Sequence, residues 1–203
     1  MVAPPTNPQI LQGYSPLAVH WTREECAGLE KAGFLNYPYE LVEGVINKMG
    51  QNIRHAGVIR RILTWLFRIF GEAYVLTQTT IDVRPEDNPT SEPQPDAIVL
   101  TRADEDFEAN PKPDELRLCI EVADTTLAYD LSVKAGLYAR AGLIEYWVVN
   151  IPERKLHIHR EPVNGTYENV TVHAETDTVA TLAAPEAMLQ VLKLFPRASS
   201  PKR

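Results

Sequence analysis

Two carboxylates occupy apolar segments that are typical of buried β-strands. In the segment LRLCIEVA, Glu121 lies on the same face as Cys119, because successive side chains of a strand point to opposite faces. In the segment PDAIVL, Asp96 shares a face with Ile98. If these strands are neighbours in one sheet, the two carboxylates repel each other unless a proton or a cation joins them. Carboxylate oxygens suit Mg²⁺ or Mn²⁺, which keep several water ligands that a phosphate can displace.

A lysine lies inside the apolar stripe of a predicted helix. Lys134 follows Leu131 and precedes Tyr138 at spacings of three and four residues, which place side chains on one face of a helix. That face is expected to pack on the sheet, so the ammonium of Lys134 would point toward Glu121. Two other interpretations stay open: Asp130, one turn earlier, could pair with Lys134 at the surface, or the lysine could extend its ammonium to water.

Glu43 and His55 are further candidates for the same site. Glu43 lies at the turn of a predicted hairpin, and His55 is on the apolar stripe of the next helix. Taken singly, each polar residue has a structural interpretation: His55 as a hydrogen-bonded core histidine, Glu121 as a solvated strand end, Asp96 as the start of a strand. Convergence of several elements on one place is harder to explain in that way, and it favours a functional site.

The elements that must position these residues alternate between helices and strands. A first helix is predicted over WTREECAGLEKAGF, where Thr22 and Glu25 have capping-box spacing, and a hairpin over YELVEGVINKM. The strongest helix is NIRHAGVIRRILTWLFRIFG, which Asn52 can cap and Gly71 can end. Three strands (AYVLTQTTIDV, PDAIVL, LRLCIEVA), a helix over residues 129–141 and the strand EYWVVN follow.

This order predicts an α/β fold. The helix between the last two strands is a crossover connection, which makes these strands parallel and the connection right-handed. We therefore expect a mixed central β-sheet flanked by helices in the order αβββαβ, with extra β-strands from KLHIHRE and YENVTVH. Residues 1–16 are predicted to form a flexible arm, residues 17–195 a single domain, and residues 196–203 a tail.

Composition limits the kinds of function. The chain has 203 residues and a formal net charge of −7, which argues against a surface that is basic throughout. Its apolar runs are too short to cross a bilayer, and no secretory signal pattern opens the sequence. Cys26 and Cys119 fit buried reduced thiols, and a cytoplasmic location follows as an expectation.

The spacing of these residues resembles that of a nuclease family. Pro95-Asp96 followed by a strand with Glu121 resembles the PD-(D/E)XK nuclease signature. More specifically, the chain resembles the Uma-type family of restriction-endonuclease-like proteins over about residues 17–195, through the stretches YELVEGVINKM, PQPDAIVL, CIEVADTT and YDLSVKAGLYARAGLIEYWVVN. In the superfamily the lysine stands two residues past the acid, where this chain has Ala123. The family places it on the following helix, where Lys134 lies.

The resemblance implies a metal-dependent endonuclease with a restriction-endonuclease-like core. Asp96 and Glu121 would bind Mg²⁺ or Mn²⁺. Lys134 would stabilise developing negative charge or orient the attacking water, and Glu43 would position a second ion or a water. His55 would be a supporting residue that holds these groups in position.

Asp130 is the second supporting residue that the resemblance implies. The implied partners are a nucleic acid, with DNA favoured and RNA left open, and a second copy of the chain in a homodimer, with no membrane.

Two alternatives belong to other functional classes. A nuclease fold retained as a catalytically inactive binding or scaffold protein is compatible with the acidic net charge. An acid/base hydrolase of sugars could use Asp96 and Glu121 as its paired carboxylates. The second leaves Lys134 unexplained, and the sequence lacks an aromatic-rich platform for a sugar.

Overall fold

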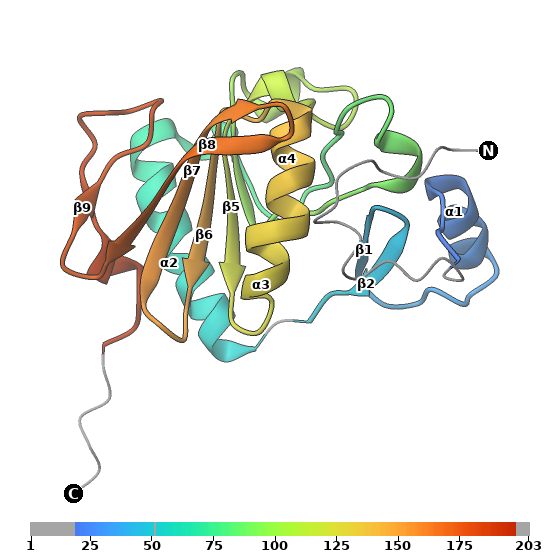
Figure 1. The fold of residues 1–203 in the computed structure, drawn as a ribbon, viewed down its shortest axis with the longest axis horizontal. Coiled ribbons are helices and arrows are strands. Elements are labelled where there is room, and N and C mark those ends of the chain that lie inside the picture. The colour runs from blue at the N-terminus through green and yellow to red at the C-terminus, as the bar shows by residue number, and fades with distance from the viewer. Residues whose placement is uncertain (1–18, 51, 198–203) are drawn as a thin grey trace, which may run out of the picture.

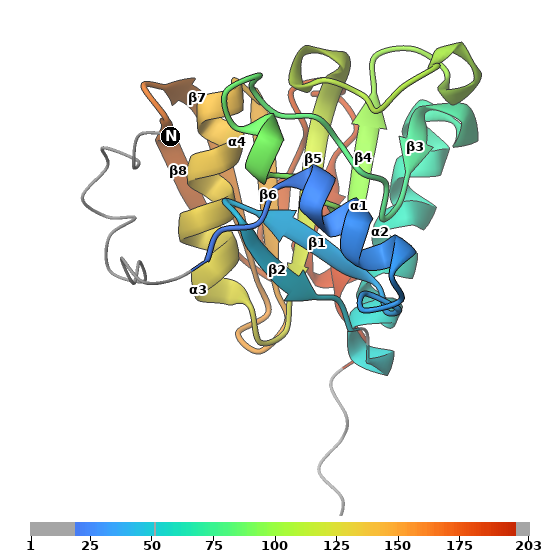
Figure 2. The same cartoon turned by 90° about the vertical axis from the view of Figure 1, so that its right-hand side faces the viewer.

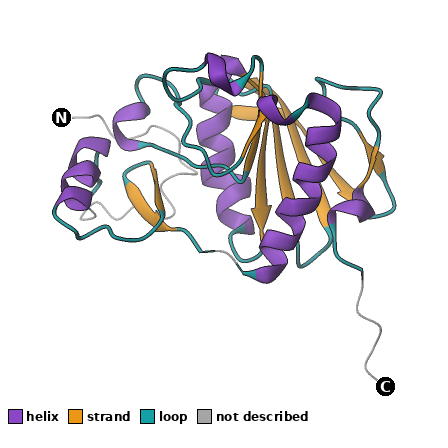
Figure 3. Ribbon diagram, turned by 180° about the vertical axis from the view of Figure 1, so that it is seen from behind, coloured by secondary structure: helices purple, strands orange, loops and turns teal. Residues whose placement is uncertain are grey.

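A central β-sheet with a helical layer on each face makes up most of the structure (Figure 1). The computed structural model describes residues 19–50 and 52–197. Within them, α2 (Ile53–Phe70) covers one face of the sheet and α4 (Ala135–Ala141) covers the other (Figures 1 and 3). The mixed α/β architecture expected from the sequence is therefore confirmed. The predicted arm, residues 1–16, and most of the predicted tail lie outside the described residues, so these domain limits stay predictions.

The sheet has six strands among the described residues, and its strand order follows the chain. Only β5 and β6 pair in parallel, as the crossover connection predicted, and every other neighbouring pair is antiparallel. The strands are β3 (Val75–Leu76), β4 (Ala97–Leu100), β5 (Leu116–Ala123), β6 (Glu145–Asn150), β7 (Lys155–Val163) and β8 (Thr166–Ala174).

The first predicted strand of the sheet, AYVLTQTTIDV, is much shorter than expected. Only β3 pairs with β4, and the chain beyond it is irregular. The amides of Gln78 and Ile81 donate to the carbonyls of Pro95 and Pro93. Because proline has no backbone N–H, neither residue can return a bond, and a regular ladder cannot continue there.

The first two helices begin and end where the sequence predicts. α1 (Arg23–Lys31) starts with the full capping box between Thr22 and Glu25. Asn52 caps α2 by accepting hydrogen bonds from the amides of Arg54 and His55, and Gly71, with a φ of 86°, ends it. Residue types at helix ends were therefore reliable signals in this chain.

The hairpin of β1 (Tyr39–Val42) and β2 (Val45–Lys48) has a two-residue turn, Glu43-Gly44. Both turn residues have positive φ, 51° and 80°, which fits the type I′ turn whose twist matches that of the flanking strands. Figure 2 shows the hairpin beside the α3–α4 layer, and Val42 packs there with Leu137. One side of the hairpin therefore faces the crossover helix.

The crossover helix is not a continuous α-helix. The predicted helix over residues 129–141 consists of α3 (Leu127–Tyr129), a π-helical turn (Asp130–Lys134) and α4. Gly142 ends it in the left-handed conformation, with a φ of 81°. The wide π turn buries both its first and its last residue, Asp130 and Lys134. Such turns are rare and often lie at functional sites.

Short elements complete the described chain. After β8 the chain forms a two-strand ribbon and a short helical turn against the end of α2. No helix in the described part is long and apolar enough to cross a membrane. The short elements are the 3-10 turns Glu72–Tyr74, Asn88–Thr90, Asp104–Asp106 and Pro113–Glu115, the strands β9 (Thr178–Val179) and β10 (Leu189–Gln190), and the 3-10 turn Val191–Leu194.

Glu145 is the most buried acid of the sheet and ties several segments together. Its side chain, which has no exposed surface, pairs with Arg160 on β7. It also accepts hydrogen bonds from Trp147 Nε1 at 3.0 Å, Thr181 Oγ1 at 2.6 Å and the Leu182 amide at 2.8 Å. This carboxylate therefore holds the segment after β9 against the sheet.

We predict that Glu145→Ala lowers the free energy of unfolding by about 3 kcal/mol, because it leaves Arg160 and several buried donors without a partner. Denaturant unfolding followed by circular dichroism measures the change. The control is Glu153→Ala, which removes an exposed ion pair with Lys155 and should change stability little. Equal effects of the two substitutions would contradict the structural role of Glu145.

Candidate active site

Asp96 and Glu121 lie opposite each other on neighbouring strands. Ala97 on β4 pairs with Ile120 on β5, and one further step of this antiparallel register places Asp96 opposite Glu121. The Val122 amide donates to Asp96 Oδ2 at 2.8 Å, which fixes the aspartate to the end of β5. Directly opposed residues have Cβ atoms about 5 Å apart, so these carboxylates share one place at the edge of the sheet. The predicted adjacency of the two strands is confirmed.

Lys134 reaches the same place from the crossover helix. Its Nζ lies 2.9 Å from Glu121 Oε1 and 2.8 Å from Glu40 Oε2. Tyr138 donates its hydroxyl to the same Glu121 oxygen at 3.0 Å. Only 4% of Lys134 is exposed, so the alternative of an ammonium extended to water is wrong.

Glu40 is the site residue that the sequence interpretation missed. It lies on β1, is 6% exposed, and accepts a hydrogen bond from the Gln94 amide at 3.3 Å as well as the ion pair with Lys134. The two-residue period of the strand places Glu40 on the same side as Val42, which packs with Leu137. The alternation that identified Glu121 could therefore have identified Glu40.

Glu43 makes a different set of contacts. Its position in the hairpin turn directs its carboxylate to Arg140 on α4, at 2.5 Å between Oε1 and Nη2. Arg140 is shared with Asp87, at 3.3 Å between Nε and Oδ2. Within the described residues no hydrogen bond or ion pair joins Glu43 to Lys134, so the structure does not bring the predicted acid into contact with the rest of the site.

His55 lies beside Asp96, as expected of a supporting residue. Its Nε2 is 3.2 Å from Asp96 Oδ2. Burial disfavours the imidazolium, but the hydrogen bond and the charge of Asp96 outweigh burial and raise the pKa of His55 above its ordinary value. Asn52, the cap of the same helix, donates to the carboxylate of Asp124, which follows β5. The start of α2 is thus fixed to the end of β5 beside the site.

Asp130 is buried, only 3% exposed, and does not form the surface ion pair that was the alternative for Lys134. Its Oδ2 accepts a hydrogen bond from Thr126 Oγ1 at 2.6 Å. Burial raises the pKa of Asp130 to about 6, although the charge of Lys134 and the bond from Thr126 oppose the shift. Asp130 therefore adds a titratable group next to the lysine without a direct contact.

The electrostatics of the site centre on Lys134. Burial by itself disfavours the ammonium, but Glu121, Glu40 and Asp130 outweigh burial and raise the pKa of Lys134 well above its ordinary value. Burial also raises the pKa of Glu121, and the ammonium of Lys134 opposes that rise. The lysine therefore stays protonated and holds two buried carboxylates that would otherwise repel each other.

The donors that remain available fit a hard divalent cation. Described residues give hydrogen bonds to Asp96 only at Oδ2 and to Glu121 only at Oε1, so Asp96 Oδ1 and Glu121 Oε2 keep their lone pairs. Two carboxylate oxygens and several waters are a usual set for Mg²⁺. No group of three or more His, Cys, Asp or Glu that could hold a metal ion occurs in the described residues, so a closed protein cage is not present there.

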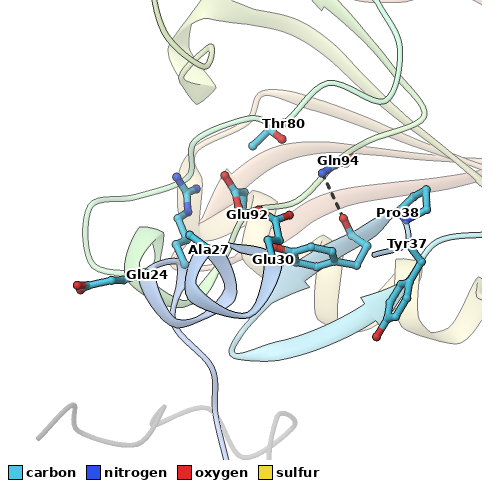
Figure 4. Close-up of a pocket in the computed structure, with 10 residues that line it drawn as sticks. Glu24, Ala27, Glu30, Tyr37, Pro38, Thr80, Glu92 and Gln94 are labelled. Atoms are coloured by element: carbon cyan, nitrogen blue, oxygen red, sulfur yellow. Dashed lines mark hydrogen bonds between the residues drawn. The ribbon is translucent and has the colours of Figure 1, made fainter. Parts of the chain in front are cut away.

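A neighbouring hollow of about 570 Å³ lies on the other side of β1, between α1 and the segment before β4 (Figure 4). Gln94 connects the two places: its side chain donates to the carbonyl of Tyr39 at 3.2 Å, and its amide donates to Glu40. Glu24, Glu30 and Glu92 line this hollow. Their negative charge makes it a poor site for a phosphate.

Comparisons with known proteins agree with this architecture. A family model described as "Uma2: Putative restriction endonuclease" matches residues 33–192. The fold is similar to that of a protein from Anabaena variabilis ATCC 29413, described as a "putative nuclease belonging to DUF820", with a TM-score of 0.58 and 15% sequence identity. The match covers 82% of this chain and 96% of that one. No curated protein matches the chain.

We predict that Asp130→Asn changes how stability depends on pH. Because the pKa of Asp130 is about 6 in the folded state and lower in the unfolded state, the folded state binds the proton more tightly, and this carboxyl makes stability fall as pH rises from about 4 to about 6. The variant should therefore be more stable than the wild type above pH 6, by up to about 3 kcal/mol, and similar to it below pH 4.

Denaturant unfolding at several pH values measures this difference. Asp114→Asn, at an exposed position, changes the net charge equally and should follow the wild-type profile. A pH profile of Asp130→Asn that parallels the wild type would show that Asp130 is not the titrating group.

Proposed function

The chain belongs to the Uma2 family, and on that premise we propose that it is a nuclease that hydrolyses phosphodiester bonds of DNA with Mg²⁺ or Mn²⁺. The observation that supports this most is the meeting of Lys134 with Glu121 beside Asp96, on three different elements. A structural ion pair would explain the lysine and one acid. It would not explain a second acid from the neighbouring strand with one oxygen left free.

Asp96 and Glu121 are the residues that would hold the cation, through Asp96 Oδ1 and Glu121 Oε2. A divalent ion there supplies polarisation of the phosphate and a lowered pKa for a bound water. The protein contributes the positions of the two oxygens. The Val122 amide and His55 hold Asp96, while Tyr138 and Lys134 hold Glu121.

Lys134 would stabilise the negative charge that develops on the phosphate or orient the attacking water. A buried ammonium already surrounded by fixed partners needs little reorganisation when charge develops nearby. Glu40 accepts from this ammonium and keeps it in place, so we assign to Glu40 the supporting acidic role that the sequence gave to Glu43. We also propose a homodimer, which would present one site to each strand of a duplex.

A catalytically inactive nuclease fold is the second candidate. The observation that favours it is that Lys134 is already neutralised by two carboxylates in a chain with a net charge of −7. A sugar hydrolase is disfavoured, because it would leave the buried Lys134, which contacts both Glu121 and Glu40, without a role.

We predict that the protein cleaves plasmid DNA in Mg²⁺ or Mn²⁺, and that Asp96→Asn and Glu121→Gln each lower the rate at least about 100-fold, since each removes a charged ligand. Gel electrophoresis of the plasmid over time measures the rate. The control Asp114→Asn should cleave as the wild type does. Cleavage by Asp96→Asn at the wild-type rate would contradict the proposal.

Metal binding separates an enzyme from an inactive fold without an activity assay. If Asp96 and Glu121 hold the ion, adding Mn²⁺ should raise the melting temperature of the wild type and leave that of Asp96→Asn unchanged. Calorimetric titration with Mn²⁺ gives the affinity directly. An identical change in melting temperature of both proteins would show that the ion binds at another site.

We further predict that the Glu40→Gln variant cleaves DNA at least about tenfold more slowly than the Glu43→Gln variant. The reason is that Glu40 contacts the lysine of the site, whereas Glu43 contacts Arg140. Circular dichroism shows whether both variants are folded. A larger loss with Glu43→Gln would restore the role predicted for it from the sequence.

A further inference from the structure

The arginines of α2 lack carboxylate partners. The helix contains Arg54, Arg60, Arg61 and Arg68 and no Asp or Glu. None of these four forms an ion pair with a described residue. Five other arginines of this acidic chain each pair with a carboxylate: Arg23, Arg102, Arg140, Arg154 and Arg160. Arg84, Arg117 and Arg197 do not, but they are scattered over different segments, whereas α2 carries four such arginines on one element without an acid of its own.

Three of these arginines follow one side of the helix. Arg54, Arg61 and Arg68 are spaced by seven residues, which is close to two helical turns, so they form one row of about 21 Å. The row lies away from the buried positions, such as Ile62, which face the sheet. Its first member adjoins His55, which contacts Asp96. The positive row thus begins beside the candidate active site and runs away from it along α2.

A groove of about 540 Å³ continues the row at the far end of α2. Its positive charge comes from Arg60, Arg61, Arg68 and Lys193, and no acid lines it. Trp65 and Met188 give it an apolar part. The hollow beside α1 has the opposite character, because three glutamates line it.

We propose that this basic face, α2 with the groove at its far end, binds the phosphate backbone of a nucleic acid strand whose other part lies in the active site. The proposal rests on the proposed function, from which the class of ligand is taken. Guanidinium groups that have no carboxylate partner can pair with phosphates, and the apolar part of the groove can contact sugars and bases. The contacts are to the backbone, so binding through this face is independent of base sequence.

The test measures binding of a short fluorescent DNA duplex by anisotropy, without metal ion, over a series of NaCl concentrations. Arg60→Gln/Arg68→Gln should raise the Kd at least about tenfold and reduce the slope of log K against log salt by about two, because each lost phosphate contact releases one counterion fewer. Glutamine favours helices about as well as arginine, so α2 should remain folded.

The matched control is Arg84→Gln/Arg117→Gln, which removes the same charge from two positions outside α2. It should keep the wild-type Kd and salt slope. Equal weakening by both double variants, or none by either, would overturn the proposal. Binding to vesicles of anionic phospholipid that exceeds binding to DNA and depends on Arg60 and Arg68 would also overturn it and make the face a membrane contact.

The outcome is separable from the proposed function. If the basic face binds DNA but no variant or wild type cleaves it, the catalytic proposal fails and this inference stands. If the wild type cleaves DNA and Arg60→Gln/Arg68→Gln cleaves with unchanged KM and unchanged salt dependence, this inference fails and the catalytic proposal stands.

Discussion

A buried ammonium shared by two carboxylates is the interaction on which the candidate site depends. Lys134 alone would be unstable in the core, and so would Glu40 or Glu121, because an unpaired buried charge costs several kcal/mol. Together they partly compensate one another's charge and connect the hairpin, the sheet and the crossover helix at one place. The same ion pairs that stabilise the arrangement also fix the charges where a phosphate could use them.

The local structure around Lys134 serves this placement. The type I′ turn of the hairpin sets the register that directs Glu40 inward, and the π turn brings the lysine toward the sheet. Asp96 is positioned from the other side, by the end of β5 and by His55 at the start of α2. Several elements that are distant in sequence must therefore come together before the site is complete. Once they have done so, the residues of the site are almost fully buried.

Patterns that depend on neighbours in the chain were read correctly from the sequence. Helix caps at Thr22 and Asn52, the hairpin, the parallel pair β5–β6 and the inward direction of Lys134 all follow from local residue types and periodicity. The error in the length of one strand has a tertiary cause: the strand after α2 ends early because its partners are prolines. The role predicted for Glu43 stays a prediction, and the structure adds that Glu40, rather than Glu43, contacts Lys134.

The net charge of this chain conceals an uneven distribution of basic and acidic residues over the fold. A net charge of −7 that was spread evenly over the surface would disfavour nucleic acid as a partner. In this fold, however, α2 carries four arginines and no acid, and three glutamates lie together beside α1. Because interactions between exposed charges are screened beyond about 10 Å at moderate salt, a strand lying along α2 would respond to those arginines and not to the distant glutamates. If the proposed function holds, the local charge along α2, and not the net charge, is therefore the relevant quantity for binding a nucleic acid strand.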